Sequence, residues 1–151
     1  MTNHNIDGFT IRPMKESDNR NIANYIRAVI DEHKASQTNS VYDDPTTDCV
    51  FQCFQGVNAQ YWVIDHNDMA VGGCGFYPTN GLPDGCAEIV KFYILPIARN
   101  HGIGAYILDY VIKQAQKAGY RQLYLETVPL FSKAIDMYVK RGFTDLFLFV
   151  T

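Results

Sequence analysis

The sequence predicts a mixed α/β fold, in which a mostly antiparallel central sheet is flanked by helices and the C-terminal half contains one βαβ unit. Three observations support this prediction. The N-terminal half holds short strand patterns joined by a hairpin turn, a long amphipathic helix follows from residue 102 to 118, and a short apolar run lies on each side of that helix. A length of 151 residues with 47% apolar residues fits one domain spanning residues 1–151.

The first elements expected are a strand and a helix. Phe9–Arg12 alternates apolar and polar residues and stops at Pro13, as strands do. Ser17 or Asp18 can cap a helix that runs to about residue 33. Its apolar residues recur at three- and four-residue steps, at Ile22, Tyr25, Ile26, Val29 and Ile30.

A loop, a short helix and a hairpin are expected next. Residues 34–47 are polar and contain a proline, which favours a loop. Residues 49–54 have one apolar face and precede Gly56, so they form a short helix. Two strand patterns, 60–65 and 69–77, are joined by a turn at 66–68.

The C-terminal half is predicted to form a βαβ unit followed by a helix and a last strand. Residues 78–85 include two prolines and two glycines and are expected to be a surface loop. The remaining elements are the strand 87–95, the helix 102–118, the strand 123–125, the helix 130–140 and the strand 143–150. Gly119 and Gly142 end the two helices.

Charge and hydropathy exclude several classes of protein. The chain has 13 Lys and Arg against 16 Asp and Glu, a net charge of -3 without a block of like charge. This is unlike a nucleic-acid-binding domain, which is basic. The sequence contains neither a signal-peptide core nor the ~20 consecutive apolar residues of a membrane helix. We therefore expect a cytoplasmic protein with no nucleic-acid or membrane partner.

The four cysteines are compatible with three hypotheses: two disulfides, one zinc site or free thiols. Their spacings lack the paired C-x-x-C knuckles of common zinc modules. The favoured reading is free, mostly buried thiols and no metal site; the alternative is a metal or redox centre. The cysteines are Cys49, Cys53, Cys74 and Cys86.

The stretch between the strand 87–95 and the long helix predicts an anion site. Gly102 and Gly104 let the backbone approach a ligand at the N-terminus of a helix, where free amides and the helix dipole favour negative charge. The stretch lacks the Gly-Lys-Ser/Thr of a Walker A loop, and Ile107 stands where a dinucleotide fingerprint needs a third glycine. A simpler alternative is that these glycines only shape a tight strand-to-helix turn.

The same stretch resembles a known family. Residues 99–104 have the form Arg/Gln-x-x-Gly-x-Gly/Ala, which marks the GNAT acetyltransferase superfamily, where it binds the pyrophosphate of acetyl-CoA. Residues 88–94 look like the fourth strand of that family. Leu125-Glu126-Thr127, followed by Ala134, Tyr138, Gly142 and Phe143, looks like its closing motif. The resemblance covers residues 87–144 closely and the N-terminal part in its order of elements.

This resemblance implies direct transfer of an acetyl group from acetyl-CoA to a primary amine in a ternary complex. An alkyl ammonium has a pKa near ~10.4, so a base must take its proton. Glu88 is the candidate base, acting through water, and Tyr138 is the candidate proton donor to the departing thiolate. Read without the family, Glu88 fits a solvated strand end and Tyr138 a core helix face.

The resemblance also implies a set of acetyl-CoA contacts. A backbone amide near residues 92–94 meets the acetyl oxygen, the loop and helix start bind pyrophosphate, and Ser132 and Lys133 meet phosphates. The candidate residues are Phe92, Tyr93, Ile94, Arg99, Asn100, His101, Gly102, Ile103, Gly104, Ala105, Thr127, Ser132 and Lys133.

Two departures from the family pattern qualify the expectation. Thr127 begins Thr-Val-Pro where many members carry Asn, so a side-chain amide contact to the pantetheine is in doubt. The chain also ends eight residues after Phe143, which leaves little room for the usual sixth and seventh strands. A missing last strand leaves an open sheet edge, from which we expect a homodimer.

The acceptor is expected between the first helices, residues 34–47 and residues 78–86. Four acidic residues in this region, Asp43, Asp44, Asp48 and Asp84, could attract a cationic amine or serve turn chemistry alone. A small-molecule amine is the expected acceptor. The alternative function is a non-catalytic acyl-CoA-binding module, which would need the glycine loop but neither Glu88 nor Tyr138.

Overall fold

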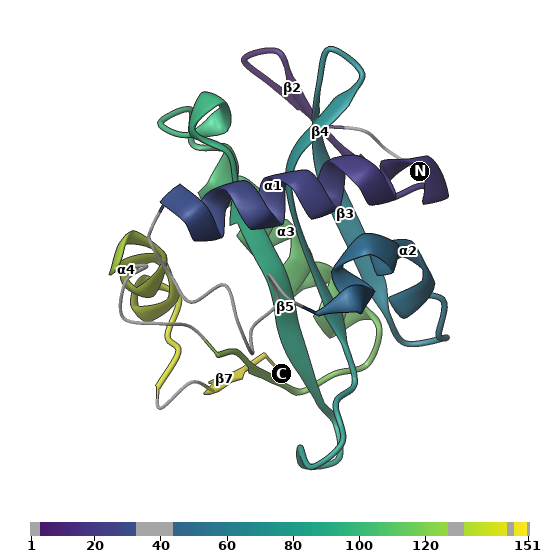
Figure 1. Cartoon of the computed structure of the whole chain (residues 1–151). Coiled ribbons are helices and arrows are strands. Elements are labelled where there is room, and N and C mark those ends of the chain that lie inside the picture. The colour runs from purple at the N-terminus through teal and green to yellow at the C-terminus, as the bar shows by residue number, and fades with distance from the viewer. Residues whose placement is uncertain (1–3, 33–43, 127–131, 145–146, 151) are drawn as a thin grey trace.

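A computed structural model of the chain describes residues 4–32, 44–126, 132–144 and 147–150. In these residues the strands form one seven-stranded sheet in the order β1 to β7 (Figure 1). Every neighbouring pair is antiparallel except β5 and β6, which are parallel as the βαβ prediction requires. The strands are β1 (His4–Ile6), β2 (Phe9–Pro13), β3 (Gln60–His66), β4 (Met69–Tyr77), β5 (Cys86–Ile94), β6 (Gln122–Tyr124) and β7 (Phe147–Phe149).

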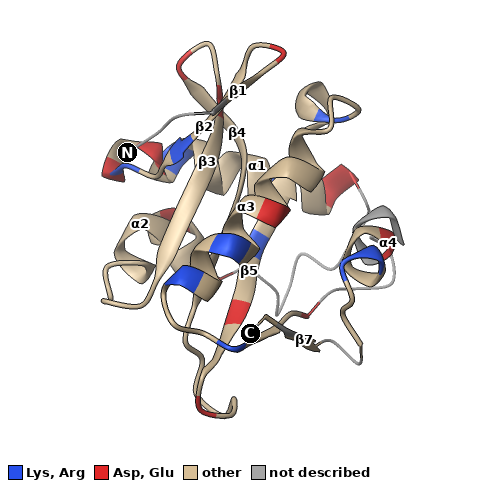
Figure 2. Ribbon diagram, turned by 180° about the vertical axis from the view of Figure 1, so that it is seen from behind, with Lys and Arg blue, Asp and Glu red and all other residues tan. Residues whose placement is uncertain are grey.

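Helices cover both faces of the sheet. Helices α1 (Asn19–Glu32) and α2 (Val50–Cys53) lie over one face (Figure 1). Helix α3 (Ile103–Lys117) lies over the other, and α4 (Ser132–Lys140) packs beside it (Figure 2). Short 3-10 helices, Glu16–Asp18, Pro45–Cys49 and Pro96–Ala98, precede α1, α2 and the turn into α3. The predicted mixed α/β class with a mostly antiparallel sheet is confirmed.

The core is divided between the two faces by the alternation of the strands. On the α3 face, strand residues such as Ile64 and Ala87 pack against the apolar stripe of α3. On the α1 face, Val63 and Val90 pack against Ile22, Tyr25 and Ile26 of α1. These helical residues are those predicted from the three- and four-residue spacing. Among the described helices, none is long and apolar enough to cross a membrane.

Strand β1 is absent from the sequence prediction, although a signal for it exists. Ile6 pairs with Phe9, so Asp7 and Gly8 alone form the turn, and both have positive φ. Asp-Gly is a favoured sequence for such two-residue hairpin turns. The turn from β3 to β4 is of the same kind, because Asn67 and Asp68 also have positive φ.

Among the described residues one strand follows α4, in the region expected to be strand, and no second strand follows it. Strand β7 has only three residues, yet it pairs with the whole of β6. Residues 143–150 were predicted to be strand throughout, but Thr144 makes only an isolated bridge to Phe147. Strand β7 covers β6 but is itself the edge of the described sheet, so the homodimer expected from an open edge stays a prediction. The predicted helix at 49–54 is also shorter than expected, since Pro45–Cys49 is 3-10 helix.

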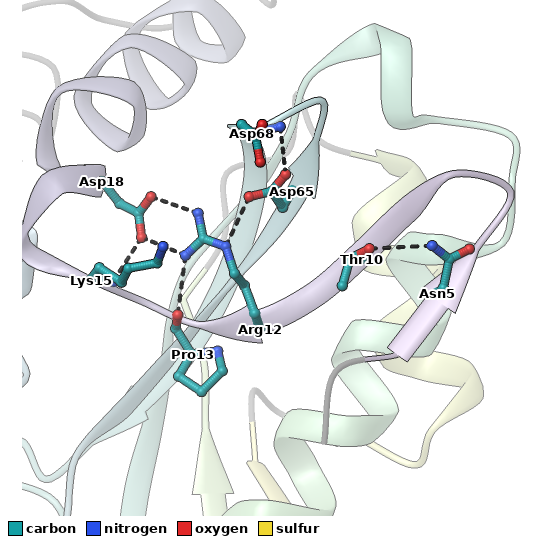
Figure 3. Close-up of polar contacts among 8 residues, drawn as sticks. All are labelled: Asn5, Thr10, Arg12, Pro13, Lys15, Asp18, Asp65 and Asp68. Carbon is teal, nitrogen blue, oxygen red and sulfur yellow. Dashed lines mark hydrogen bonds and ion pairs between the residues drawn. The ribbon is translucent and has the colours of Figure 1, made fainter. Parts of the chain in front are cut away.

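An ion-pair network holds the start of α1 against the sheet (Figure 3). Arg12 of β2 donates two hydrogen bonds of 2.8 Å to Asp18 and a third of 2.8 Å to Asp65 at the end of β3. The amide of Lys15 also donates to Asp18, at 2.7 Å. Although burial alone acts to raise the pKa of Asp18, the hydrogen bonds from Arg12 and Lys15 lower it below its usual value. The network therefore stabilises the charged carboxylate.

Replacing Arg12 by Ala leaves Asp18, only 4% exposed, without its cation. We expect the free energy of unfolding to fall by about 3 kcal/mol at pH 7 in urea titrations, because a buried carboxylate is left unpaired. Arg12→Lys keeps the charge but not the two-pronged geometry, and a smaller loss is expected.

The pKa of Asp18 is lowered in the folded protein, so the stability it contributes is present above the usual Asp pKa and is lost as pH falls. The difference between wild type and Arg12→Ala should therefore shrink below pH ~3.9. Equal stability of the two proteins at pH 7 would contradict this account.

Candidate active site

Strand β5 carries a β-bulge at its centre. Gly73 pairs with Tyr93 and Gly75 with Val90, so Cys74 alone lies opposite both Lys91 and Phe92. Lys91 has a φ of 54°, in the left-handed region that costs a residue with a side chain ~1 kcal/mol. The extra residue keeps Lys91 on the α1 face and returns Phe92 to the α3 face.

One edge of β5 is paired with a neighbouring strand over only part of its length. The parallel pairing with β6 covers Cys86 to Glu88, whereas the strand continues beside β4 to Ile94. Among the described residues, no strand pairs with this edge of β5 beyond Glu88. Backbone groups after the bulge are thus left without a strand partner, which is how a sheet offers main-chain hydrogen bonds to a ligand.

The N-terminus of α3 lies against the same end of β5. A Cβ on Gly104 would come within 2.8 Å of Ile94 Cδ1, so glycine lets the helix approach the strand closely. Gly102, with a φ of 74°, turns the chain into the helix, and a Cβ there would meet nothing within 4 Å. The first hydrogen bond of the helix runs from the Tyr106 amide to the Gly102 carbonyl. The amides of Ile103, Gly104 and Ala105 therefore have no acceptor within the helix.

The side chains of the glycine loop are held by the scaffold. The Arg99 guanidinium donates to Glu32 at the end of α1, at 2.5 and 2.6 Å, and to the carbonyl of Ile94, at 2.8 and 3.0 Å. His101 lies 3.5 Å from Asp7, and its ring is 5.0 Å from that of Phe9. Both side chains thus contact the scaffold, Arg99 at the end of α1 and His101 at the β1–β2 hairpin.

Tyr138 of α4 lies on the α3 face beside the bulge. Its ring centroid is 6.3 Å from that of Phe92 and 5.8 Å from that of Phe143. Burial raises the pKa of Tyr138 well above its usual value, so its hydroxyl is protonated at neutral pH. Among the described residues the hydroxyl has no hydrogen-bond partner. Arg141 anchors α4 to α3 by a 2.6 Å ion pair with Asp109.

Glu88 lies on the other face of the sheet, at the point where β5 leaves β6. It pairs with Tyr77 of β4 and accepts a 2.8 Å hydrogen bond from Thr79. Burial raises the pKa of Glu88, and the nearby charge of Glu126 adds to the increase. Burial also lowers the pKa of Lys91, on the same face. Glu88 and Tyr138 therefore approach the bulge from opposite faces.

Other predicted site residues fall in several places. Phe92 and Ile94 face α3, Tyr93 packs on the α1 face, Asn100 adopts a positive φ in the loop, and Ile103 is buried. Thr127 and the side chains of Ser132 and Lys133 lie outside the described residues.

The acidic residues of the expected acceptor region are partly explained by local contacts. Asp44 caps a 3-10 helix through the Thr46 amide, and Asp48 pairs with Arg27. Asp43 lies outside the described residues.

The four cysteines are free thiols, with Cys74 and Cys86 buried. Within the described parts of the chain, no group of three or more His, Cys, Asp or Glu side chains could hold a metal ion.

Comparisons with known proteins place this geometry in a family. A family model described as the acetyltransferase (GNAT) family matches residues 26–143. The uncharacterized N-acetyltransferase YjgM of Escherichia coli K12 is 31% identical over 137 residues, which cover 90% of this chain and 82% of that protein. The chain belongs to the GNAT family of acetyltransferases. The resemblance seen in the sequence is confirmed, and with it the prediction of an acyl-CoA-dependent acetyltransferase.

Other acetyltransferases match over a smaller share of the chain or at lower identity. The IAA acetyltransferase of Azospirillum brasilense is 33% identical over 84 residues, covering 56% of this chain and 54% of that protein. A GNAT-family acetyltransferase from Staphylococcus aureus Mu50 superposes with a TM-score of 0.79 at 21% identity, covering 90% of this chain and 83% of its own. An acetyltransferase from Streptococcus agalactiae reaches 0.77 at 15% identity, with coverages of 91% and 84%. The two structures show the shared fold.

Sequence reasoning missed two parts of this GNAT site. Glu32 follows an ordinary helix pattern, and only the fold brings it to Arg99. The bulge at Lys91 had a signal in the glycines of β4, because glycine within a strand often marks a bulge or a close backbone approach. Gly72, Gly73 and Gly75 lie directly beside the bulge.

The left-handed conformation of Lys91 predicts an unusual order of stability for two variants. Lys91→Gly removes the strain and Lys91→Ala retains it, so the glycine variant should be more stable by about 1 kcal/mol in urea unfolding. At the exposed helical position Lys113 the order should be reversed, since alanine is favoured there by about 1 kcal/mol. An alanine variant at 91 as stable as the glycine variant would contradict the assigned backbone conformation.

Proposed function

We propose that this chain transfers an acetyl group from acetyl-CoA to a primary amine, both bound at the bulge of β5. The observation that carries the proposal is the packing of free helix amides at the start of α3 against the unpaired end of β5. These two features offer one ligand an anion site and, next to it, a strand edge. A phosphorylated carrier with an amide-containing arm has the matching groups in the same order.

The pyrophosphate of acetyl-CoA fits the loop and helix start, residues 99–105. The amides of Gly102, Ile103, Gly104 and Ala105 are the donors, and the open space over Gly102 leaves room for phosphate oxygens. Arg99, Asn100 and His101 shape the loop around them. The edge formed by Phe92, Tyr93 and Ile94 takes the pantetheine arm. Contacts from Thr127, Ser132 and Lys133 stay predictions.

Acetyl-CoA supplies an activated acyl carbon as a thioester. In the transfer, the amine nitrogen forms a bond to that carbon, the carbon–sulfur bond breaks, and the electron pair leaves on sulfur. Glu88 takes the proton that the amine releases, through a water molecule. Its burial supports this role, because a raised pKa makes a carboxylate a stronger base.

Tyr138 donates its proton to the departing sulfur, which leaves as the thiol. Before the next turnover Tyr138 takes a proton back from solvent and Glu88 releases to solvent the proton that it received. The position of Tyr138 against Phe92 on the α3 face, with a hydroxyl that is protonated and without a partner in the described residues, supports its role as the proton donor. Donor and base then act from opposite faces of β5, so the amine approaches from the α1 face. A small amine is the proposed acceptor class.

Calorimetric titration with acetyl-CoA, followed by thiol release with a panel of amines, tests the proposal. We expect saturable binding and acceptor-dependent release of one thiol for each acetylated amine. Folded protein that does not bind acetyl-CoA would refute the proposal. Binding without thiol release for any amine would favour the acyl-CoA-binding module.

Glu32→Gln distinguishes two roles for Arg99 in binding acetyl-CoA. If Arg99 fixes the loop through Glu32, the variant should weaken binding about 3- to 10-fold in calorimetry, because a loop that must be ordered on binding costs free energy. If the Arg99 guanidinium instead contacts phosphate, its release from Glu32 should strengthen binding. The second result would overturn the assignment of Arg99 to the scaffold.

Glu88→Gln should lower kcat/KM by about 10²-fold or more at neutral pH, because the base is lost. The raised pKa of Glu88 also has a consequence for stability, since the folded protein favours the neutral carboxyl. The stability that this preference contributes at low pH is lost as pH rises through the raised pKa. In urea unfolding the variant should therefore be at least as stable as wild type at pH 8, and a less stable variant there would contradict the assigned environment.

A further inference from the structure

Two tyrosine hydroxyls form a buried chain beneath the bulge. The hydroxyl of Tyr61, from β3, donates a 2.8 Å hydrogen bond to the backbone carbonyl of Lys91. The hydroxyl of Tyr25, from α1, is hydrogen-bonded to that of Tyr61. Tyr25 is 1% exposed and Tyr61 4% exposed. Lys91, which carries the backbone strain of the bulge, is therefore also the residue whose carbonyl accepts the hydrogen bond from Tyr61.

Counting protons fixes the direction of the chain. A phenol has one proton to donate, and that of Tyr61 goes to Lys91. Tyr25 must then donate to Tyr61, so both donors point along the chain toward the Lys91 carbonyl. Burial raises the pKa of both hydroxyls, and they keep their protons at every pH at which the enzyme would work.

Two glycines of β4 leave room for the tyrosine rings that lie over this strand. A Cβ on Gly73 would lie 2.5 Å from the Tyr25 hydroxyl and 2.6 Å from the Tyr61 hydroxyl. A Cβ on Gly75 would lie 2.6 Å from Cδ2 of Tyr61. Tyr61 can cross β4 to reach β5 only because both positions are glycine. The glycines of β4, the two tyrosines and the bulge of β5 therefore depend on one another.

The hydrogen bond from Tyr61 determines where the Phe92 amide points. The structure contains no cis peptide among its described residues, so the Lys91 carbonyl and the Phe92 N–H lie on opposite sides of one trans peptide. With the carbonyl held by Tyr61 on the α1 face, the Phe92 N–H points away from Tyr61. A hydrogen bond accepted by a peptide carbonyl also polarises that peptide and strengthens its N–H as a donor.

We propose that Tyr25 and Tyr61 are positioning residues for acyl transfer, which hold and polarise the Lys91–Phe92 peptide so that the Phe92 amide donates to the acyl oxygen of the bound thioester. This inference rests on the proposed function. Negative charge grows on that oxygen as the amine attacks, and a preorganised donor stabilises it more than a donor that must reorient. Among the described residues, the hydrogen bonds of these hydroxyls are to each other and to the Lys91 carbonyl.

The test is an infrared spectrum of acetyl-CoA labelled with 13C at the thioester carbonyl, bound without acceptor. In the wild type the carbonyl band should lie at lower frequency than in free acetyl-CoA, because it accepts a hydrogen bond. In Tyr61→Phe at least half of this displacement should disappear. With an acceptor, kcat should fall about 10- to 100-fold, a part of the loss seen when an oxyanion donor is removed. Affinity for CoA without an acyl group should stay within about twofold, because the phosphate contacts are untouched.

Two variants keep the test specific. Tyr120→Phe also removes a hydroxyl bonded to a backbone carbonyl, that of Asn58, but at the end of α3. It should leave both the band and kcat unchanged. Tyr25→Phe keeps the Tyr61 bond to Lys91 and should give a smaller change than Tyr61→Phe.

The outcomes separate the inference from the function it rests on. Wild-type protein that does not bind acetyl-CoA would count against the proposed function. Wild-type protein that binds it without displacing the band would count against the Phe92 amide as donor. A displaced band in the wild type that is unchanged in folded Tyr61→Phe would overturn the role of the tyrosine chain.

Discussion

The hydrogen bond from the Tyr61 hydroxyl to the Lys91 carbonyl is the interaction on which the arrangement of the site depends. It contacts the strained residue at the bulge of β5, and this bulge sets which side chains face which helix beyond that point. Phe92 and Ile94 turn toward α3, where Gly104 and Tyr138 meet them. Without the bulge, normal alternation would place every later side chain on the wrong face.

In the proposed site, backbone amides rather than charged side chains bind the anion. Arg99 of the glycine loop is paired with Glu32 of α1, and His101 lies 3.5 Å from Asp7 in the turn between β1 and β2. A site of this kind depends on distant elements, because α1 must sit correctly for Arg99 to hold the loop. The network of Arg12, Asp18 and Asp65 secures the other end of α1. The proposed chemistry is therefore linked to the packing of the N-terminal half.

Much of this structure could be read from the sequence, for identifiable reasons. The apolar spacing of α1 and α3 follows from burial on one face, which a local pattern records. Strands β3 and β4 are buried almost throughout because helices cover both faces of the sheet, and they appear in the sequence as mainly apolar runs. The glycine loop was found because a helix start beside two glycines is a local signal. Strand β1 was missed although Asp7-Gly8 marks its turn, and β7 is shorter than the strand expected over residues 143–150. Contacts such as Arg99 with Glu32, or Tyr25 with Tyr61, join segments far apart in sequence and leave no periodic trace.

The most direct measurement of the central claim is an amide correlation spectrum of 15N-labelled protein titrated with CoA and then with acetyl-CoA. The account predicts that CoA shifts the amide signals of Ile103, Gly104 and Ala105, and that only the acetylated form adds a downfield shift of the Phe92 amide. Unchanged signals at the start of α3 on saturation with CoA would contradict it.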